Sequence, residues 1–119
     1  MSETATGGIV RIWKGRVRSE QAAFYTAYLF EGGPKVMLEK LGARGVQMLR
    51  RELGDETEFT VLSYWDSVKA MKAWAGEDVA RTRHLDRDPE LLVELPEFVE
   101  IHEVPFNIWQ LAGTVAPAG

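Results

Sequence analysis

The chain has two histidines and no cysteine, so few of its side chains can transfer a proton near neutral pH or bind a metal ion. His84 follows Trp74 by ten residues and lies in a charged stretch with Arg83 and Asp86. Its imidazole is suited to ligating iron or to acting as a general base, although charged neighbours are also typical of a solvated loop. His102 lies in an alternating apolar segment, where a structural hydrogen bond is a simpler role. Both histidines are candidate catalytic residues.

Four tryptophans and three tyrosines supply candidate ligand contacts. An indole N–H needs a partner when it is buried, so a tryptophan that faces a cavity can orient an oxygen atom of a ligand. Trp74 also shares a helical stripe with Met71 and Ala75, which is equally typical of a core residue. A tyrosine or an arginine can bind an oxyanion. The candidate substrate-binding residues are Arg11, Trp13, Tyr28, Trp65 and Trp74.

The candidate residues lie in segments whose sequence patterns predict strands and helices. A strand is predicted at 9–17, and a helix from Ser19 to the helix-breaking Gly32-Gly33-Pro34. Strands at 43–53 and 58–66, joined by a short turn, predict an antiparallel hairpin. A helix follows from residue 68, with one or two further turns to His84, and after a polar loop a last strand is expected at 98–104. The order β-α-β-β-α-β predicts an α+β, ferredoxin-like fold with an antiparallel sheet.

The strand at 58–66 is apolar on both sides. Phe59 and Val61 alternate with Leu62 and Tyr64, so the sheet has a second apolar face that the helices do not cover. Such a face is more often an interface than a solvated surface. We therefore expect a homodimer in which two sheets pack into a closed α+β barrel.

Length, composition and charge argue against a nucleic-acid-binding, membrane-spanning or secreted protein. The chain has 119 residues and a formal net charge of −4, which favours one domain and gives no clustered excess of basic residues for nucleic acid. No apolar run is long enough to span a membrane, and the start "MSETATGG" does not resemble a secretory signal, so a cytoplasmic protein is expected. Residues 1–8 are expected to be a flexible leader, 9–106 the domain, and 107–119 a C-terminal extension that packs on the partner.

Three stretches, "SYWDS", "VKAMKAWAGEDVARTR" and "VEIHEV", together with the order of elements, resemble the antibiotic biosynthesis monooxygenase superfamily over residues 9–104. Members of that superfamily are dimeric α+β barrels with a small apolar chamber between sheet and helices. The resemblance implies a small hydrophobic or aromatic ligand. In the cofactor-independent members, it also implies oxygenation of polycyclic aromatic substrates by dioxygen without metal or flavin.

A second branch of the superfamily degrades heme and ligates the iron through a histidine ten residues after a helix tryptophan. Trp74 and His84 reproduce that spacing. That branch also uses an asparagine in the first strand, whereas "IVRIWKG" offers Arg11, Ile12 and Trp13 instead. The resemblance thus leaves a heme-binding or heme-degrading protein as an alternative. A ligand-binding or stress-response dimer without catalytic activity is a third hypothesis, because a fold does not determine a function.

Overall fold

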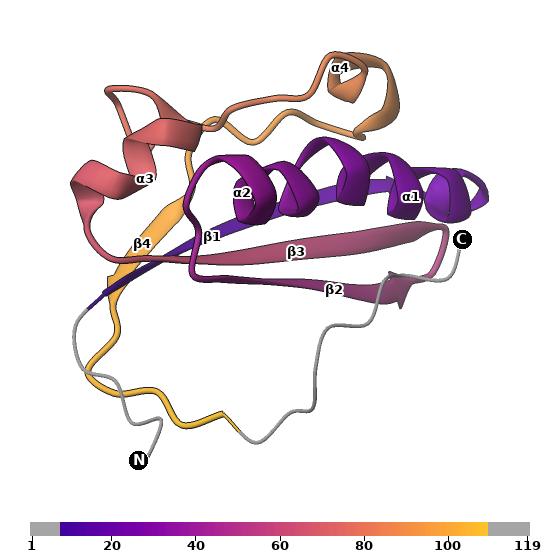
Figure 1. The fold of residues 1–119 in the computed structure, drawn as a ribbon. Coiled ribbons are helices and arrows are strands. Elements are labelled where there is room, and N and C mark those ends of the chain that lie inside the picture. Colours follow the sequence, from indigo (N-terminus) through magenta and orange to yellow (C-terminus); the bar gives the residue numbers. More distant parts are fainter. Residues whose placement is uncertain (1–7, 110–119) are drawn as a thin grey trace.

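The computed structural model describes residues 8–109, in which four strands form one antiparallel sheet (Figure 1). Their spatial order is β2-β3-β1-β4, the order of a ferredoxin-like sheet, so the predicted α+β fold is confirmed. The strands are β1 (Ile9–Arg18), β2 (Gly45–Leu53), β3 (Glu56–Trp65) and β4 (Glu100–Glu103). The helices are a short 3-10 turn, η1 (Ser19–Gln21), then α1 (Ala22–Gly32), α2 (Pro34–Lys40), α3 (Val68–Ala75) and α4 (Asp88–Leu91).

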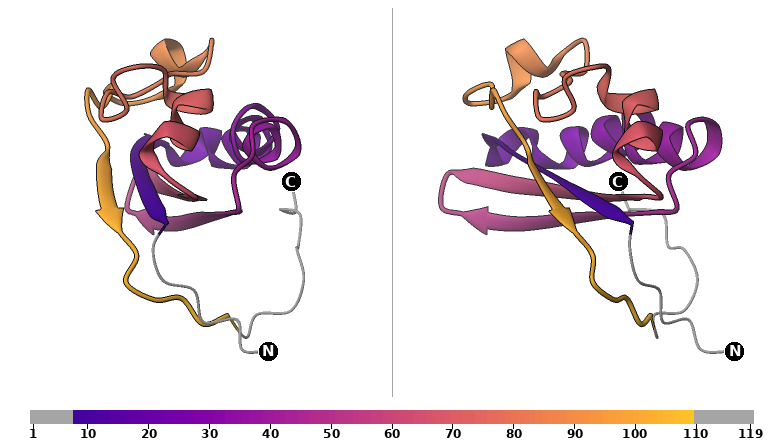
Figure 2. Two further views of the ribbon diagram at one scale, coloured as in Figure 1. Left: turned by 60° about the vertical axis from the view of Figure 1, so that its left-hand side comes forward. Right: turned by 90° about the vertical axis from the view of Figure 1, so that its left-hand side faces the viewer.

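Strand register decides which side chains face the helices. In the pairing of β1 with β3, Arg11 lies opposite Ser63 and Trp13 lies opposite Val61. Because side chains alternate along a strand, the odd-numbered residues of both strands point to the helical side. Ile101 of β4 also lies opposite Arg11, which puts it on that side. The helices gather on one side of the sheet (Figure 2).

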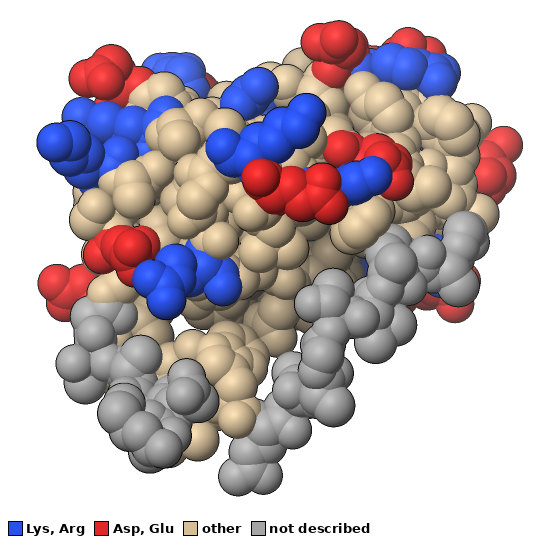
Figure 3. Space-filling model, in the orientation of Figure 1, with Lys and Arg blue, Asp and Glu red and all other residues tan. Residues whose placement is uncertain are grey.

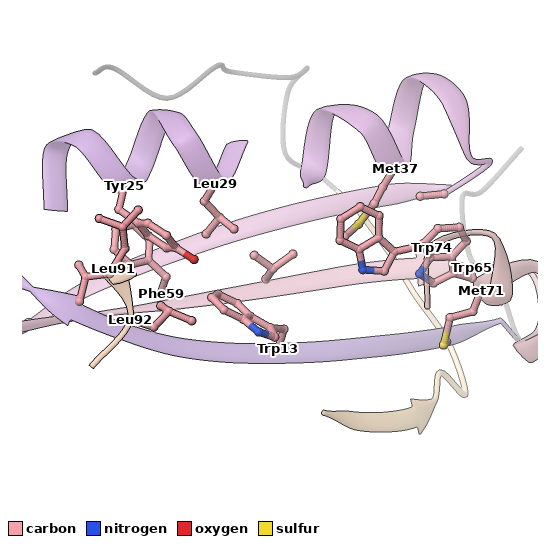
Figure 4. Packing of buried hydrophobic residues seen from close by; sticks show 13 residues of the cluster. Trp13, Tyr25, Leu29, Met37, Phe59, Trp65, Met71, Trp74, Leu91 and Leu92 are labelled. Atoms are coloured by element: carbon pink, nitrogen blue, oxygen red, sulfur yellow. The ribbon is translucent and has the colours of Figure 1, made fainter. Parts of the chain in front are cut away.

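The core fills the space between the helices and this face (Figure 4). Helix α1 contributes Tyr25 and Leu29, and α3 contributes Met71 and Trp74 at helical spacing. Ser67 caps α3 by accepting a hydrogen bond from the amide of Ala70 at 3.0 Å, as its residue type predicts. The sheet side of the core includes Trp13, Val17, Phe59, Val61 and Trp65, and Leu91 and Leu92 close one end.

Three local predictions were wrong. Helix α3 ends at Ala75 and does not continue towards His84, because Gly76 takes a φ of 83° that leaves the helical region. The last strand is four residues long and does not span 98–104. Ser19 does not cap a helix through its side chain. Its hydroxyl contacts the carbonyl of Gly54 and the hydroxyl of Thr57 in the β2–β3 hairpin instead.

The second face of the sheet lies away from the helices. It carries Leu49, Leu62 and Tyr64, and Trp109 packs edge-on against Tyr64 with ring centroids 5.6 Å apart. In the view of Figure 3, acidic and basic side chains are interspersed over the part of the surface where the helices lie. Within residues 8–109, no helix has both the length and the apolar character needed to span a membrane. The expected leader, apart from Gly8, and residues 110–119 of the expected extension lie outside the described residues.

Candidate functional site

A pocket lies between the odd-numbered face of the sheet and the helices. The pocket is small, with a cavity volume of about 20 Å³, and it is partly open to solvent. Aromatic and aliphatic side chains make up most of the walls, as in typical small-molecule sites. The apolar walls are Trp13, Leu29, Pro34, Met37, Val61, Trp74 and Leu85, and the polar residues are Arg11, Ser63, Arg83 and Asp88.

Arg11 brings a buried positive charge to this pocket. The side chain of this β1 residue is on the helical side, and the residue is only 3% exposed. Its Nε donates to the carbonyl of Val79 at 3.0 Å and its Nη2 to the carbonyl of Arg81 at 2.8 Å. Among residues 8–109, no carboxylate lies within 4.0 Å of this guanidinium. Burial lowers the pKa of Arg11 to about 10, so the group is still charged at neutral pH.

Ser63 lies beside Arg11 on the neighbouring strand. Its hydroxyl oxygen accepts a hydrogen bond from the indole Nε1 of Trp65 at 2.9 Å. Trp65 is buried in the core and does not line the pocket, so its contribution to the site is to orient Ser63. Trp65 was expected to contact the substrate directly, whereas in the structure it can act on the site only through Ser63.

Two tryptophans from different elements line the pocket. Trp74 projects from α3, and the guanidinium of Arg83 lies 4.2 Å from its ring centroid while Nη1 donates to the Trp74 carbonyl at 3.0 Å. This stacking is a cation–π contact, which fixes Arg83 at the pocket. Trp13 projects from β1, and its ring extends over Gly15: a Cβ at that glycine would lie 2.6 Å from the far end of the indole.

Asp88 is buried, although the sequence predicts a polar loop between His84 and the last strand. It is 2% exposed and lines the pocket. Oδ1 accepts from the hydroxyl of Tyr25 at 2.8 Å and Oδ2 from the amide of Leu85 at 2.8 Å. Burial, and then the negative charge of Asp88, raise the pKa of the Tyr25 hydroxyl far above its usual value. Tyr25 therefore keeps its proton and holds the carboxylate in place.

Three candidate residues from the sequence lie elsewhere. His84 is half-buried in the irregular segment after α3 and does not line the pocket, although both of its neighbours do. Its Nδ1 is buried without a hydrogen-bond partner in the described part of the chain. His102 is exposed on the second face of the sheet, where its Nε2 lies 2.9 Å from Glu100. The hydroxyl of Tyr28 accepts from the amide of Arg87 at 2.8 Å, outside the pocket wall.

The pocket thus brings together Arg11, Trp13 and Trp74 from the predicted set, and adds Ser63 and Asp88. Alternation along β3 already predicts that Ser63 shares a face with Val61, so its position was available from the sequence. The partner of Asp88 was not, because Tyr25 lies 63 residues away along the chain. Within residues 8–109, no three side chains of His, Cys, Asp or Glu group in a way that could hold a metal ion.

A comparison with a solved structure agrees with this architecture. A protein from Bacillus cereus that is assigned to the antibiotic biosynthesis monooxygenases has the same fold, with 14% identity and a TM-score of 0.50 over 94% of this chain and 99% of the other. The heme-degrader MhuD from Mycobacterium tuberculosis, solved with two hemes in its active site, gives 19% identity and a TM-score of 0.45 over 89% of this chain and 99% of the other. No functionally curated protein matches the sequence. The family model for antibiotic biosynthesis monooxygenases matches residues 9–84, which is more than half of the chain. The chain belongs to the antibiotic biosynthesis monooxygenase family.

Proposed function

We propose that this protein is a monooxygenase that oxidises a compact aromatic substrate with dioxygen, without metal or flavin. The observation that carries the proposal is a mostly apolar pocket, walled by Trp13 and Trp74, that contains the buried cation Arg11. Apolar walls exclude water and accept aromatic rings, while a positive charge in a low-dielectric site favours the anionic form of a bound phenol. Membership of the monooxygenase family supports the same reaction class.

The chemistry needs little from the protein beyond binding and electrostatics. A phenol or its keto tautomer loses a proton, and the resulting carbanion-like anion transfers one electron to dioxygen. The two radicals combine at carbon to form a peroxide, which loses water to leave a carbonyl group. For anthrone, one dioxygen yields one anthraquinone and one water. Arg11 and Arg83 supply positive charge near the pocket that stabilises the anion.

Oxygen uptake with anthrone and its hydroxylated derivatives tests this proposal. We expect the protein to consume one dioxygen per quinone formed, faster than the uncatalysed reaction. Leu29→Phe, which adds ring volume to the pocket wall, should slow the reaction. His84→Ala and His102→Ala should leave it unchanged, because neither imidazole lines the pocket. If oxygen uptake stays at the uncatalysed rate with every substrate, the monooxygenase proposal is wrong and a ligand-binding protein becomes the better interpretation.

Heme ligation by His84 fits this site poorly. The imidazole is not part of the pocket wall, and Arg83 occupies the position stacked on Trp74. The first strand also places Arg11 and Trp13, rather than an amide side chain, at the pocket. Titration with hemin should therefore give the same Soret band for the wild type and for His84→Ala. A band that is present in the wild type and absent from the variant would restore the heme hypothesis.

A further inference from the structure

The guanidinium of Arg11 has one edge that the fold does not use. An arginine carries five N–H donors in a planar fork. The edge formed by Nε and Nη2 donates to the carbonyls of Val79 and Arg81. The opposite edge, formed by Nη1 and the second N–H of Nη2, takes part in neither of these two bonds to residues of the described chain. That edge has the geometry that binds the two oxygens of a carboxylate in parallel.

Ser63 adds a second donor to the same pocket wall. It lies directly opposite Arg11 in the β1–β3 pairing, and cross-strand neighbours have Cβ atoms roughly 5 Å apart. Its oxygen accepts from Trp65 Nε1, so the hydroxyl proton is left for another acceptor. No residue of the described part accepts that proton, and Ser63 is buried in the pocket wall.

The charges around the pocket favour an anion. Arg11 and Arg83 each contribute one positive charge to its wall, and Asp88 is the negatively charged residue that lines it. Both oxygens of Asp88 already accept hydrogen bonds, from Tyr25 and from the amide of Leu85. The carboxylate is therefore engaged by other groups and leaves the charge of Arg11 without a directly bonded counter-ion.

We propose that Arg11 and Ser63 form an anion-binding subsite, and that the natural ligand is a compact aromatic carboxylate. The carboxylate binds the free edge of Arg11 and the hydroxyl of Ser63, while the ring lies between Trp13 and Trp74. This inference rests on the proposed function only in taking the pocket as the substrate site; it adds that the oxidisable ring carries a carboxylate. A purely structural Arg11 would need only its bonds to Val79 and Arg81, with its remaining donors bound to water, so the two roles differ in whether a carboxylate replaces that water.

Binding can be measured without turnover. We propose titrating ¹⁵N-labelled protein with 2-naphthoate and with its uncharged analogue 2-naphthamide, following the indole N–H signals in two-dimensional NMR spectra. The signals of Trp13 and Trp74, which line the pocket, should shift. Trp109, which packs against Tyr64 on the second face of the sheet, is an internal control and should not shift. We expect 2-naphthoate to bind at least about tenfold more tightly than 2-naphthamide.

Three variants distinguish binding of the ligand by Arg11 from the role of Arg11 in holding the loop at Val79 and Arg81. Arg11→Met should abolish the preference for naphthoate while naphthamide still binds within about twofold of the wild type, whereas Arg11→Lys should retain part of the preference. Ser63→Ala, which leaves the bonds of Arg11 to the loop intact, should reduce the preference as well. Equal wild-type affinities for the two ligands, or an equal loss of both in Ser63→Ala, would overturn the subsite. Because no turnover is involved, a failed oxygen-uptake experiment leaves this result standing, and a successful one does not replace it.

Discussion

At the scale of single residues, the Trp13 ring can lie where it does because residue 15 is a glycine and has no side chain. A Cβ at position 15 would lie 2.6 Å from the indole and 3.2 Å from Leu92. Trp13 is a rigid, buried ring, so it cannot move aside as a flexible chain end would. We therefore predict that Gly15→Ala displaces the indole, destabilises the fold by about 1–3 kcal/mol and weakens ligand binding.

Gly45→Ala is the matched control for this change. Gly45 lies in β2, and its added Cβ would meet the Tyr64 ring at 3.9 Å, an ordinary contact. This variant should bind ligands like the wild type. Urea unfolding and the Trp13 indole signal measure the two effects, and an unshifted signal in Gly15→Ala would show that the ring does not depend on the glycine.

The hydrogen bond between Tyr25 and Asp88 supports a second prediction at this scale. Tyr25→Phe removes one of the two donors that hold a buried carboxylate, which should lower the free energy of unfolding by about 2 kcal/mol. The pKa of Tyr25 is raised in the folded protein, so the folded state holds the proton more tightly than the unfolded chain does. The stabilisation from this group is complete below pH 10, the usual pKa of tyrosine, and is lost as the pH rises above it.

The difference in stability between the wild type and Tyr25→Phe should therefore shrink above pH 10. Arg11 also has a shifted pKa in this range, but it is present in both proteins, so its contribution cancels in the difference. Urea unfolding at several pH values between neutrality and pH 11 measures the trend. A difference that stays constant across this range would mean that the hydroxyl is not held in its neutral form by the fold.

At the scale of elements, the end of α3 controls the segment that completes the pocket. Gly76 has a φ of 83°, and residues 76–87 then run without regular helix to Arg83 and Leu85 at the pocket wall. With its ψ of −167°, this backbone conformation is nearly exclusive to glycine, and an alanine there is strained by roughly 1–3 kcal/mol. We predict that Gly76→Ala lowers the free energy of unfolding by this amount and also changes the Trp74 signal and ligand affinity, because the strain is relieved by moving the segment.

Gly54→Ala provides the comparison. Gly54 also has a positive φ, 69°, and an added Cβ meets nothing within 4 Å at either glycine, so both variants strain the backbone without a side-chain clash. Gly54 lies in the β2–β3 turn, away from the pocket. If both variants changed ligand affinity equally, the effect would come from global destabilisation rather than from the segment after α3.

Strands and helices with a regular spacing of apolar residues could be predicted from the sequence, but the residues at which they end could not. Alternation from Phe59 to Trp65 specified both faces of β3, and the cap at Ser67 specified the start of α3. The end of α3 was missed because "EDVARTR" has good helix formers after Gly76, whose backbone conformation decided the outcome. Arg11, Trp13 and Trp74 were predicted ligand contacts that do line the pocket. Asp88 was missed because its burial depends on a hydroxyl that arrives from α1.

At the scale of the whole molecule, the second face of the sheet carries exposed apolar side chains. The described chain covers part of it, since Trp109 packs on Tyr64, while Leu49 is 51% and Leu53 43% exposed. Both leucines are on the long β2–β3 hairpin, and Phe106 and Ile108 add exposed apolar surface in the segment after β4. One chain thus leaves an apolar area that a second sheet could bury.

We propose that two copies pair through this face, and a charge placed on it should separate them. Light scattering at micromolar concentration should give the mass of a dimer for the wild type and of a monomer for Leu49→Lys, because a buried ammonium without a counter-ion opposes association. Leu95→Lys is the control, since Leu95 is similarly exposed, at 44%, but lies in the segment after α4 rather than on the sheet. Dissociation by both variants would point to a contact outside the sheet, and a monomeric wild type would exclude the pairing.

The pocket lies on the opposite side of the sheet from this face. The monomeric variant should therefore still bind 2-naphthoate, which separates assembly from ligand recognition.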